Sequence, residues 1–274
     1  MTRSARELLA KIESRRVISL VGGGGKTTLM FRLARELTRQ GKRVITTTTT
    51  KIAHDEARQA GVLIVAESTG DQLVGHLNQA LHTHGQVSLA QERLSGQGKL
   101  LGIDMKMVET VLAARICDHL IVEADGAARR PLKAPAAHEP LLPDSTDLLI
   151  AVVGLDGVGK SLTPEWVHRP EEVGRLSGLA PGETIGAEDV ARVIAHDQGL
   201  MKNLPPGAES WVFLNQADLP GAKITGIKIA EILLDEMPRH PRQLIIGAAA
   251  REHWIYKAYL LGGREKEKKA EEYE

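Results

Sequence analysis

The residues best suited to chemistry follow the aliphatic run Val17–Val21, which leads into four glycines, Gly22, Gly23, Gly24 and Gly25, and then into Lys26-Thr27-Thr28. Converging backbone N–H groups bind phosphate because glycine permits close approach and unusual dihedral angles, and a helix N-terminus adds partial positive charge. In such a loop the lysine reaches the β- and γ-phosphates, and the first threonine hydroxyl coordinates Mg²⁺. The pattern predicts a phosphate-binding loop from Gly22 to Thr28, with Thr27 as a metal ligand.

This loop departs from the pattern Gly-x-x-x-x-Gly-Lys-Thr, because the first glycine of that pattern falls on Leu20. It also resembles the deviant form Lys-Gly-Gly-x-Gly-Lys-Thr, with Val21 in place of the signature lysine. Proteins with related loops often dimerise across the nucleotide, and Val21 weakens the expectation of a homodimer. A glycine-rich turn that binds nothing is the less favoured interpretation, because strand and helix flank the loop correctly.

Two carboxylates end a second aliphatic run, His119–Ala124, as Glu123 and Asp125. At the end of a strand beside a phosphate loop, carboxylates hold Mg²⁺ directly or through water. Residues two apart on a strand share a face, so both can point to the same ligand. We expect Asp125 to hold the metal or sense the γ-phosphate and Glu123 to orient the attacking water. Solvated acids at a strand end are the alternative.

Three cations come next, as Arg129, Arg130 and Lys133, and Pro131 and Pro135 favour a fixed loop there. Near a γ-phosphate they could act as an internal arginine finger or hold an anionic substrate. Solvated surface charge is an equally good interpretation.

Two further segments end predicted strands at the same edge. Thr46–Thr50 offers hydroxyls for phosphate or metal-bound water, although threonine also simply favours strands. Asn215 and Asp218 resemble the guanine-reading Asn-Lys-x-Asp, with Gln216 in place of the lysine that packs on the base. We expect Asn215 and Asp218 to bind the base, which leaves ATP and GTP both open.

The elements that must position these residues alternate between strand and helix. Apolar runs predict strands at Val17–Val21, Arg43–Thr47, Val62–Ala66, His119–Ala124, Leu148–Gly154, Trp211–Asn215 and Gln243–Gly247. Helical periodicity is found at Thr27–Gln40, Asp71–Thr83, Asp104–Ile116, Glu188–His196 and Thr225–Glu236. This alternation predicts an α/β fold with a doubly wound, mostly parallel sheet. We expect one domain over residues 1–262, with a helical insertion at 163–206 and a charged, disordered tail at 263–274.

Composition narrows the class of protein. The chain has 274 residues, with 35 lysines and arginines against 35 aspartates and glutamates, so no nucleic acid or anionic membrane is expected as a partner. Cys117 is the single cysteine, which excludes an intramolecular disulfide and a cysteine-rich zinc site. No signal peptide and no apolar run of membrane-spanning length is found, so we expect a cytoplasmic protein.

Taken together, several segments resemble the YqeC family, whose members are accessory proteins of selenium-dependent molybdenum hydroxylases. The segments that carry the resemblance are Val21–Thr28, Thr46–Ile52, Val122–Pro135, His138–Pro140, Val153–Asp156, Val167–Arg169 and Leu214–Asp218. The resemblance extends from the first strand to about Ala249. It implies a P-loop NTPase that uses Mg²⁺ with ATP or GTP and assists maturation or cofactor insertion in a molybdenum hydroxylase. Two alternatives stay open: a small-molecule kinase or ligase that holds an anionic substrate on the 129–133 loop, and a non-catalytic nucleotide-gated binding module.

Overall fold

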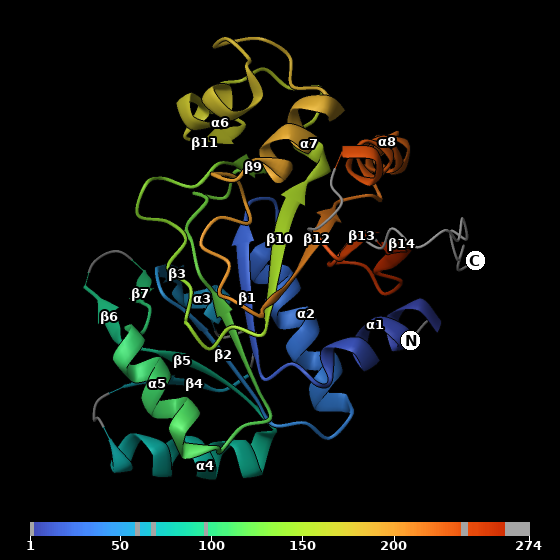
Figure 1. Cartoon of the computed structure of the whole chain (residues 1–274). Coiled ribbons are helices and arrows are strands. Elements are labelled where there is room, and N and C mark those ends of the chain that lie inside the picture. The colour runs from blue at the N-terminus through green and yellow to red at the C-terminus, as the bar shows by residue number, and fades with distance from the viewer. Residues whose placement is uncertain (1–2, 58–60, 67–69, 96–97, 237–240, 261–274) are drawn as a thin grey trace.

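A nine-stranded sheet forms the centre of the fold (Figure 1). The computed structural model describes residues 3–57, 61–66, 70–95, 98–236 and 241–260. The strand order is β14-β13-β12-β10-β1-β8-β2-β5-β4. Every neighbouring pair in it is parallel except β13 and β14. Its strands are β1 (Val17–Gly22), β2 (Val44–Thr48), β4 (Leu63–Val65), β5 (Gln86–Ala90), β8 (His119–Glu123), β10 (Leu148–Gly154), β12 (Glu209–Asn215), β13 (Gln243–Gly247) and β14 (Ile255–Leu260).

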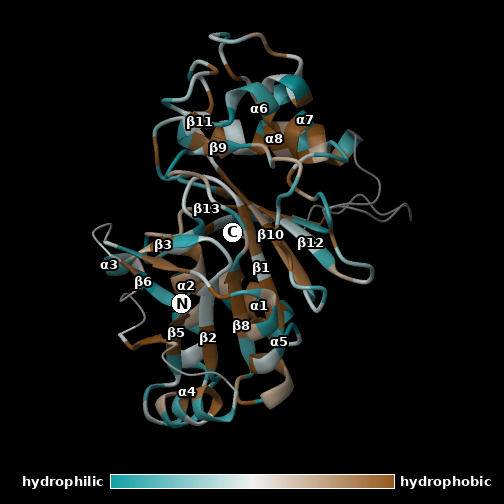
Figure 2. Cartoon of the chain, turned by 90° about the vertical axis from the view of Figure 1, so that its left-hand side faces the viewer, coloured by the Kyte–Doolittle hydropathy of each residue, from teal (hydrophilic) through white to brown (hydrophobic). Residues whose placement is uncertain are grey.

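The helices cover both faces of this sheet because its central strands are apolar on both sides. In β10 alternate residues belong to different cores: Leu149, Ala151 and Val153 to one, Ile150 and Val152 to the other. Figure 2 shows the central strands as largely hydrophobic ribbons. The helices are α1 (Arg3–Ile12), α2 (Lys26–Arg39), α3 (His54–Ala57), α4 (Asp71–His84), α5 (Met105–Ala114), α6 (Pro170–Ser177), α7 (Ala187–Ala195) and α8 (Ala222–Glu236).

Three hydrophobic clusters join these layers. One packs α1 and α2 against one face of the sheet. On the other face, one cluster joins α4 and α5 to β2, β5 and β8, and another joins α6, α7 and α8 to β10, β12 and β13. The predicted doubly wound, mostly parallel fold is therefore confirmed.

Smaller elements decorate the sheet. Residues 163–206 lie between the neighbouring strands β10 and β12 and hold α6, α7 and the short strand β11 (Val167–His168). β11 pairs in parallel with β9 (Leu132–Lys133), which follows β8. A three-stranded antiparallel unit contains β3 (Lys51–Ala53), β6 (Glu92–Leu94) and β7 (Lys99–Leu101). A short 3-10 turn, η2 (Leu155–Gly157), follows β10.

Several elements escape the sequence patterns, among them the short strands β3, β6, β7, β9 and β11. β5 was not predicted, although all five of its residues are buried in the sheet, because Gln86 and Ser88 interrupt its aliphatic run. α1 and the antiparallel strand β14 were also not predicted. The charged tail expected at 263–274 lies outside the described residues.

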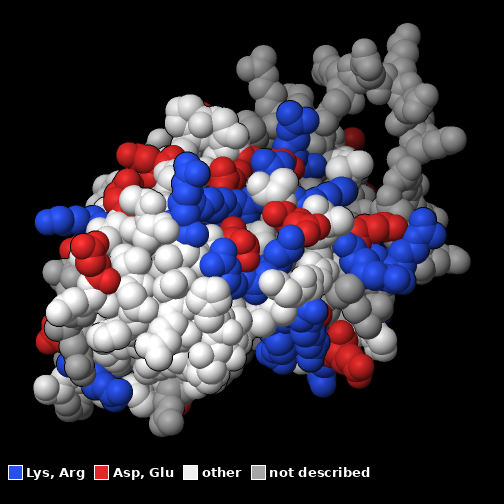
Figure 3. Space-filling view, turned by 90° about the horizontal axis from the view of Figure 1, so that it is seen from below, with Lys and Arg blue, Asp and Glu red and all other residues white. Residues whose placement is uncertain are grey.

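The strand directions put the carboxyl ends of β8, β1, β10 and β12 at one edge of the sheet, the upper edge in Figure 1. Figure 3 shows the opposite, lower end, where acidic side chains are interspersed among the lysines and arginines. None of the described helices is long and apolar enough to cross a membrane.

Candidate functional site

The glycine loop joins β1 to α2 at the upper edge of the sheet. β1 ends at Gly22 and α2 begins at Lys26, with Gly25 as its N-cap residue. Gly22, Gly24 and Gly25 have φ angles of 96°, 73° and 113°, which other residues adopt only with strain. No side chain caps the N-terminus of α2, so the partial positive charge of that helix end faces the loop.

Each glycine of the loop also lies against another segment. A methyl group on Gly22 would come within 2.2 Å of the Val152 carbonyl oxygen, and one on Gly24 within 2.3 Å of Gly154. A methyl group on Gly23 would lie 2.6 Å from the Arg130 carbonyl oxygen. The four glycines thus allow the loop to pack tightly between the ends of β8, β10 and β12, in addition to any part in phosphate binding.

Lys26 is buried beneath this loop, with 4% of its surface exposed. Its Nζ donates to the Gly22 carbonyl at 2.5 Å and lies 3.1 Å from Asp125 Oδ1 and 3.7 Å from Glu123 Oε1. Burial by itself would lower the pKa of Lys26, but Asp125 and Glu123 outweigh it and raise the pKa above its ordinary value. The lysine is therefore charged at neutral pH.

The two carboxylates and Thr27 converge on the same place. Thr27 Oγ1 donates to Glu123 Oε2 at 2.7 Å, and the Gly22 N–H donates to Asp125 Oδ2 at 3.0 Å. Asp125 is 1% exposed, and its Oδ1 accepts no hydrogen bond from the described residues although Lys26 lies beside it. A buried carboxylate oxygen with unused lone pairs, close to an uncapped helix end, together with the Thr27 hydroxyl on the neighbouring Glu123, fits a hydrated Mg²⁺ with phosphate.

The segment after Asp125 folds back onto the glycine loop. Ala128 and Arg129 have φ angles of 47° and 61°, a rare conformation for residues other than glycine. This turn lets the Arg130 carbonyl accept the Gly24 N–H at 2.9 Å. One amide that could bind phosphate is thus paired with the protein's own backbone. Non-glycine residues held at positive φ cluster at functional sites, which makes this turn a candidate moving part.

Lys133 is not a solvated surface charge, because its side chain is 0% exposed. Its Nζ contacts three acceptors: Asp125 Oδ2 at 2.9 Å, Glu139 Oε2 at 2.7 Å and the Gly126 carbonyl at 2.7 Å. Arg129 is exposed and Arg130 is partly exposed. The three cations predicted to act together therefore separate into a buried one and two at the surface.

Glu139 and Arg169 extend this buried charge network towards α6. Arg169, the N-cap residue of α6, donates to both carboxylate oxygens of Glu139, at 2.5 and 3.0 Å. Burial by itself would raise the pKa of Glu139, but the bonds from Arg169 and Lys133 lower it to about 2. Sequence reasoning gave neither residue a role, because they lie 30 positions apart and no local motif joins them.

Asn215 ties the glycine loop to the ends of β12 and β13. Its Nδ2 donates to the Gly24 carbonyl at 2.7 Å, and its Oδ1 accepts the Ala249 N–H at 2.9 Å. Asp218 pairs with Arg251 at 2.7 Å. Asn215 therefore lies at the loop, whereas Asp218 is turned towards Arg251 in this conformation.

The end of β10 contributes a residue that sequence reasoning did not assign. Asp156 Oδ1 and Gln216 Oε1 are buried and accept no hydrogen bond from the described residues. Both lie 2.6 Å from the position of a methyl group on Gly154, which itself packs on Gly24. Burial raises the pKa of Asp156 above its ordinary value. These two oxygen atoms lie close to the glycine loop and have no donor among the described residues.

Most hydroxyls of Thr46–Thr50 bond to neighbouring strands, which leaves fewer of them for phosphate or metal-bound water than the sequence predicts. Thr46 shares a hydrogen bond with Ser88, Thr47 donates to the Leu89 carbonyl, and Thr48 donates to the Glu123 carbonyl. These hydroxyls stabilise the sheet. Thr49 Oγ1 is the exception, since it is buried and has no hydrogen-bond partner in the described part of the chain.

No group of three or more histidine, cysteine, aspartate or glutamate residues that could hold a metal occurs among the described residues. His168, at the end of β11, has a lowered pKa because of burial and the nearby Arg169 and Lys133. Cys117 is buried. The metal-binding candidates that remain are therefore Thr27 with Asp125.

Comparison with known proteins gives both sequence and structural matches. The model of the YqeC protein family matches residues 18–171. The YqeC protein of Escherichia coli is 34% identical over 202 residues, which cover 73% of this chain and 75% of that protein.

Among solved structures, hydrogenase maturation factor HypB of Archaeoglobus fulgidus aligns over 91% of this chain and 89% of its own, with 11% identity and a TM-score of 0.40. The MinC:MinD cell division complex of Aquifex aeolicus aligns over 84% of this chain and 81% of the matched chain, with 16% identity and a TM-score of 0.42.

Proposed function

The chain belongs to the YqeC family, and we propose that it binds a nucleoside triphosphate with Mg²⁺ and hydrolyses it. The observation that carries this proposal is the convergence of Lys26, Thr27, Glu123 and Asp125 at the N-terminus of α2. A buried cation, an uncapped helix end and two carboxylates at the edge of a parallel sheet are the parts that a metal–phosphate group requires.

Each residue of the site has a role in the proposed hydrolysis that follows from its chemistry. Lys26 turns from Asp125 to the β- and γ-phosphates, and the loop Gly22–Gly25 lines the phosphates together with Thr28. The Gly22 N–H keeps its bond to Asp125 Oδ2, so the later amides of the loop are the ones that contact phosphate. The Thr27 hydroxyl and Asp125 hold the metal, which neutralises charge that develops on the phosphates. Glu123 orients the attacking water. Arg129 and Arg130, the cations at the surface, stabilise negative charge that develops on the transferred phosphoryl group.

Binding requires a rearrangement, because the Arg130 carbonyl now occupies the Gly24 N–H. The turn at Ala128 and Arg129 has to release this bond before that amide can contact phosphate. Asn215 fixes the loop from the other side, and Asp218 leaves Arg251 to contact the base. ATP and GTP both remain candidate ligands.

We further propose that nucleotide turnover serves an accessory step in the maturation or cofactor insertion of a molybdenum hydroxylase. The support for this part is the family resemblance carried by the 122–135 segment. Co-purification of the client enzyme that depends on the bound nucleotide would be the direct measurement.

The alternative of a kinase or ligase loses one of its three supports, because Lys133 is fully buried and pairs with Asp125 and Glu139. Arg129 and Arg130 alone do not favour it over hydrolysis. A non-catalytic nucleotide-gated module differs from the proposal only in phosphate release.

Titration with ATP and GTP tests the proposal, with and without Mg²⁺, for the wild type and Lys26→Ala. We expect one nucleotide to bind with Mg²⁺ and Lys26→Ala to abolish binding, because the substitution removes the cation beneath the loop. Lys42→Ala is the matched control, since Lys42 pairs with Glu13 at the other end of the sheet. Phosphate release then separates an NTPase from a binding module. Failure of both nucleotides to bind the folded wild type would overturn the proposal.

A further inference from the structure

The buried and partly buried charges around Asp125 form one connected set with equal numbers of cations and anions. Lys26, Lys133 and Arg169 are the cations, and Glu123, Asp125 and Glu139 are the anions. Ionised groups are costly to bury unless they are paired. Because Lys26 and Lys133 both contact Asp125, from its Oδ1 and Oδ2 sides respectively, they share the compensation of its charge.

Nucleotide binding changes this balance. Phosphate draws Lys26 away from Asp125, which leaves Lys133 as the cation against that carboxylate. Lys133 is well placed to stay, because its other two contacts are the Gly126 carbonyl and Glu139, and neither belongs to the glycine loop. The Gly22 N–H donates to Asp125 Oδ2, which is also the oxygen that Lys133 contacts. Lys26 contacts the other oxygen, Oδ1, so Oδ1 becomes available to a metal when Lys26 moves to the phosphates.

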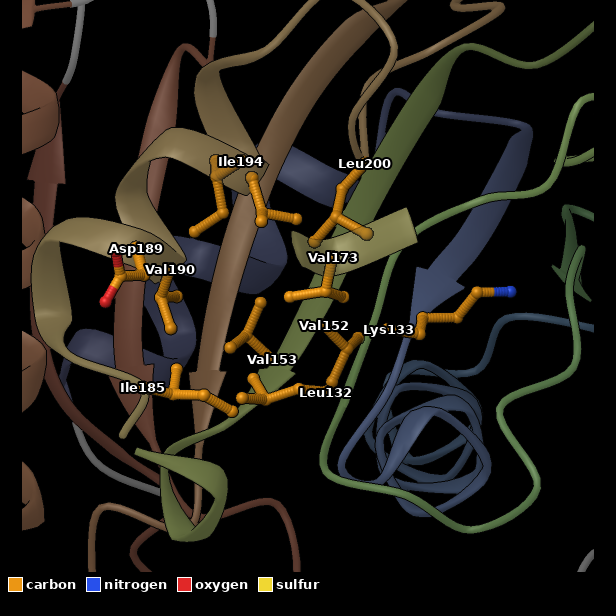
Figure 4. Close-up of a pocket in the computed structure, with 11 residues that line it drawn as sticks. Leu132, Lys133, Val152, Val153, Val173, Ile185, Asp189, Val190, Ile194 and Leu200 are labelled. Carbon is orange, nitrogen blue, oxygen red and sulfur yellow. The ribbon is translucent and has the colours of Figure 1, made fainter. Parts of the chain in front are cut away.

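The path of the Lys133 side chain explains its rigidity. Figure 4 shows its stem beside the apolar side chains of a pocket under α6 and α7, with the nitrogen pointing away from them. β9 pairs with β11, so the backbone of Lys133 is fixed beside His168, the residue before Arg169. Arg169 in turn fixes Glu139 through two hydrogen bonds. The segment with α6 and α7 thereby supports the carboxylate at the phosphate site.

We propose that Lys133 is a positioning residue of the metal–nucleotide site. It orients Asp125 Oδ1 towards the metal, and it compensates the charge of Asp125 once Lys26 contacts phosphate. Glu139 and Arg169 hold Lys133 in place. This inference rests on the proposed function and adds a set of supporting residues to it. It assigns Lys133 no contact with nucleotide or substrate.

The test is a titration of the full-length protein with Mg²⁺–ATP and Mg²⁺–GTP. Lys133→Met keeps most of the side-chain volume without the charge, and we expect it to weaken binding about 10- to 100-fold, the range found for residues that orient metal ligands. Lys133→Arg should recover part of the loss. Lys202→Met is the control, because Lys202 donates to the Ala136 and Ala137 carbonyls of the same loop but contacts no carboxylate of the network.

A double-mutant cycle separates positioning from a general effect on the fold. In the Asp125→Asn background, Lys133→Met should add little to the loss, because the charge that Lys133 serves is gone. The double variant also restores the charge balance, so it should fold even if Lys133→Met alone does not. Thermal unfolding of each variant checks this, and Arg169→Met, at the outer end of the network, should give a smaller loss of affinity than Lys133→Met.

The outcomes are distinct. Equal affinities of Lys133→Met and the wild type, or an equal loss in both backgrounds, would overturn the positioning role and leave the proposed function intact. A folded wild type that binds neither Mg²⁺–nucleotide would overturn both.

Discussion

At the scale of single residues, the site depends on how buried charges are paired. Asp125 contacts two lysines, and Glu139 contacts a lysine and an arginine. Removing one partner of such a pair is more costly than replacing both, because it leaves an uncompensated charge in a poorly solvated place. The effect of a single substitution in this network should therefore be compared with that of the double substitution that replaces both partners of the ion pair.

Glu139 gives a prediction about acid stability. Its pKa is lowered from the ordinary 4.5 to about 2, so the folded protein holds this proton less tightly than the unfolded chain. The resulting stabilisation is fully present above pH about 4.5 and is lost as the pH falls towards 2. Denaturant unfolding of the wild type and Glu139→Gln at several pH values measures it. The difference in unfolding free energy should be largest at neutral pH and shrink through this window; a difference independent of pH would contradict the assignment.

At the scale of elements, the glycine loop and the segment from Ala127 to Pro131 form one packed unit. The Arg130 carbonyl accepts the Gly24 N–H, and the Pro131 carbonyl accepts the Gly154 N–H. The turn therefore joins the ends of β1 and β10. Nucleotide-dependent movement of this turn would reach β9, and through it β11 and α6.

Two glycines provide a matched test of this packing. A methyl group on Gly23 would lie 2.6 Å from the Arg130 carbonyl oxygen and 2.8 Å from that of Pro131, whereas one on Gly126 would meet nothing within 4 Å. Gly23→Ala should lower the free energy of unfolding by about 1–3 kcal/mol, the usual cost of overpacking, and Gly126→Ala should leave it nearly unchanged. Chemical denaturation checks both, and equal stabilities of the two variants would show that the loops do not pack as described.

At the scale of the whole molecule, the doubly wound sheet gathers distant segments at one edge. The ends of β8, β1, β10 and β12 lie side by side, although they are spread over nearly two hundred residues (Figure 1). Three hydrophobic clusters hold helices on both faces of this sheet. A ligand that bridges several strand ends should therefore stabilise the whole fold.

Thermal unfolding tests that expectation. A ligand that binds the folded state alone adds about 2.7 kcal/mol of stability at a concentration one hundred times its Kd. The melting temperature of the wild type should rise with Mg²⁺–nucleotide and rise less with EDTA present, and Lys26→Ala should show no rise. An equal rise in Lys26→Ala would place the binding site elsewhere.

Sequence alone determined the fold class and the strand ends that carry polar groups. A long aliphatic run such as Leu148–Gly154 is typical of a strand that is buried on both faces of a parallel sheet. The run itself therefore predicts the strand, without knowledge of the strands that pair with it. The glycine loop was recognisable because it depends on local backbone freedom and a strand-to-helix junction. β5 was missed because its polar residues are buried by pairing with β2 and β4, which no local pattern reveals.

Only the tertiary structure decided how the charges are shared. Lys133, Glu139 and Arg169 carry no motif that joins them, and their meeting depends on the pairing of β9 with β11. The contact of the Arg130 carbonyl with the Gly24 amide likewise depends on the turn at Ala128 and Arg129. The physical reason is the distance along the sequence between the residues that interact. A glycine loop of this kind is encoded by adjacent residues, whereas a buried charge is compensated by whichever groups the fold brings within about 3 Å of it.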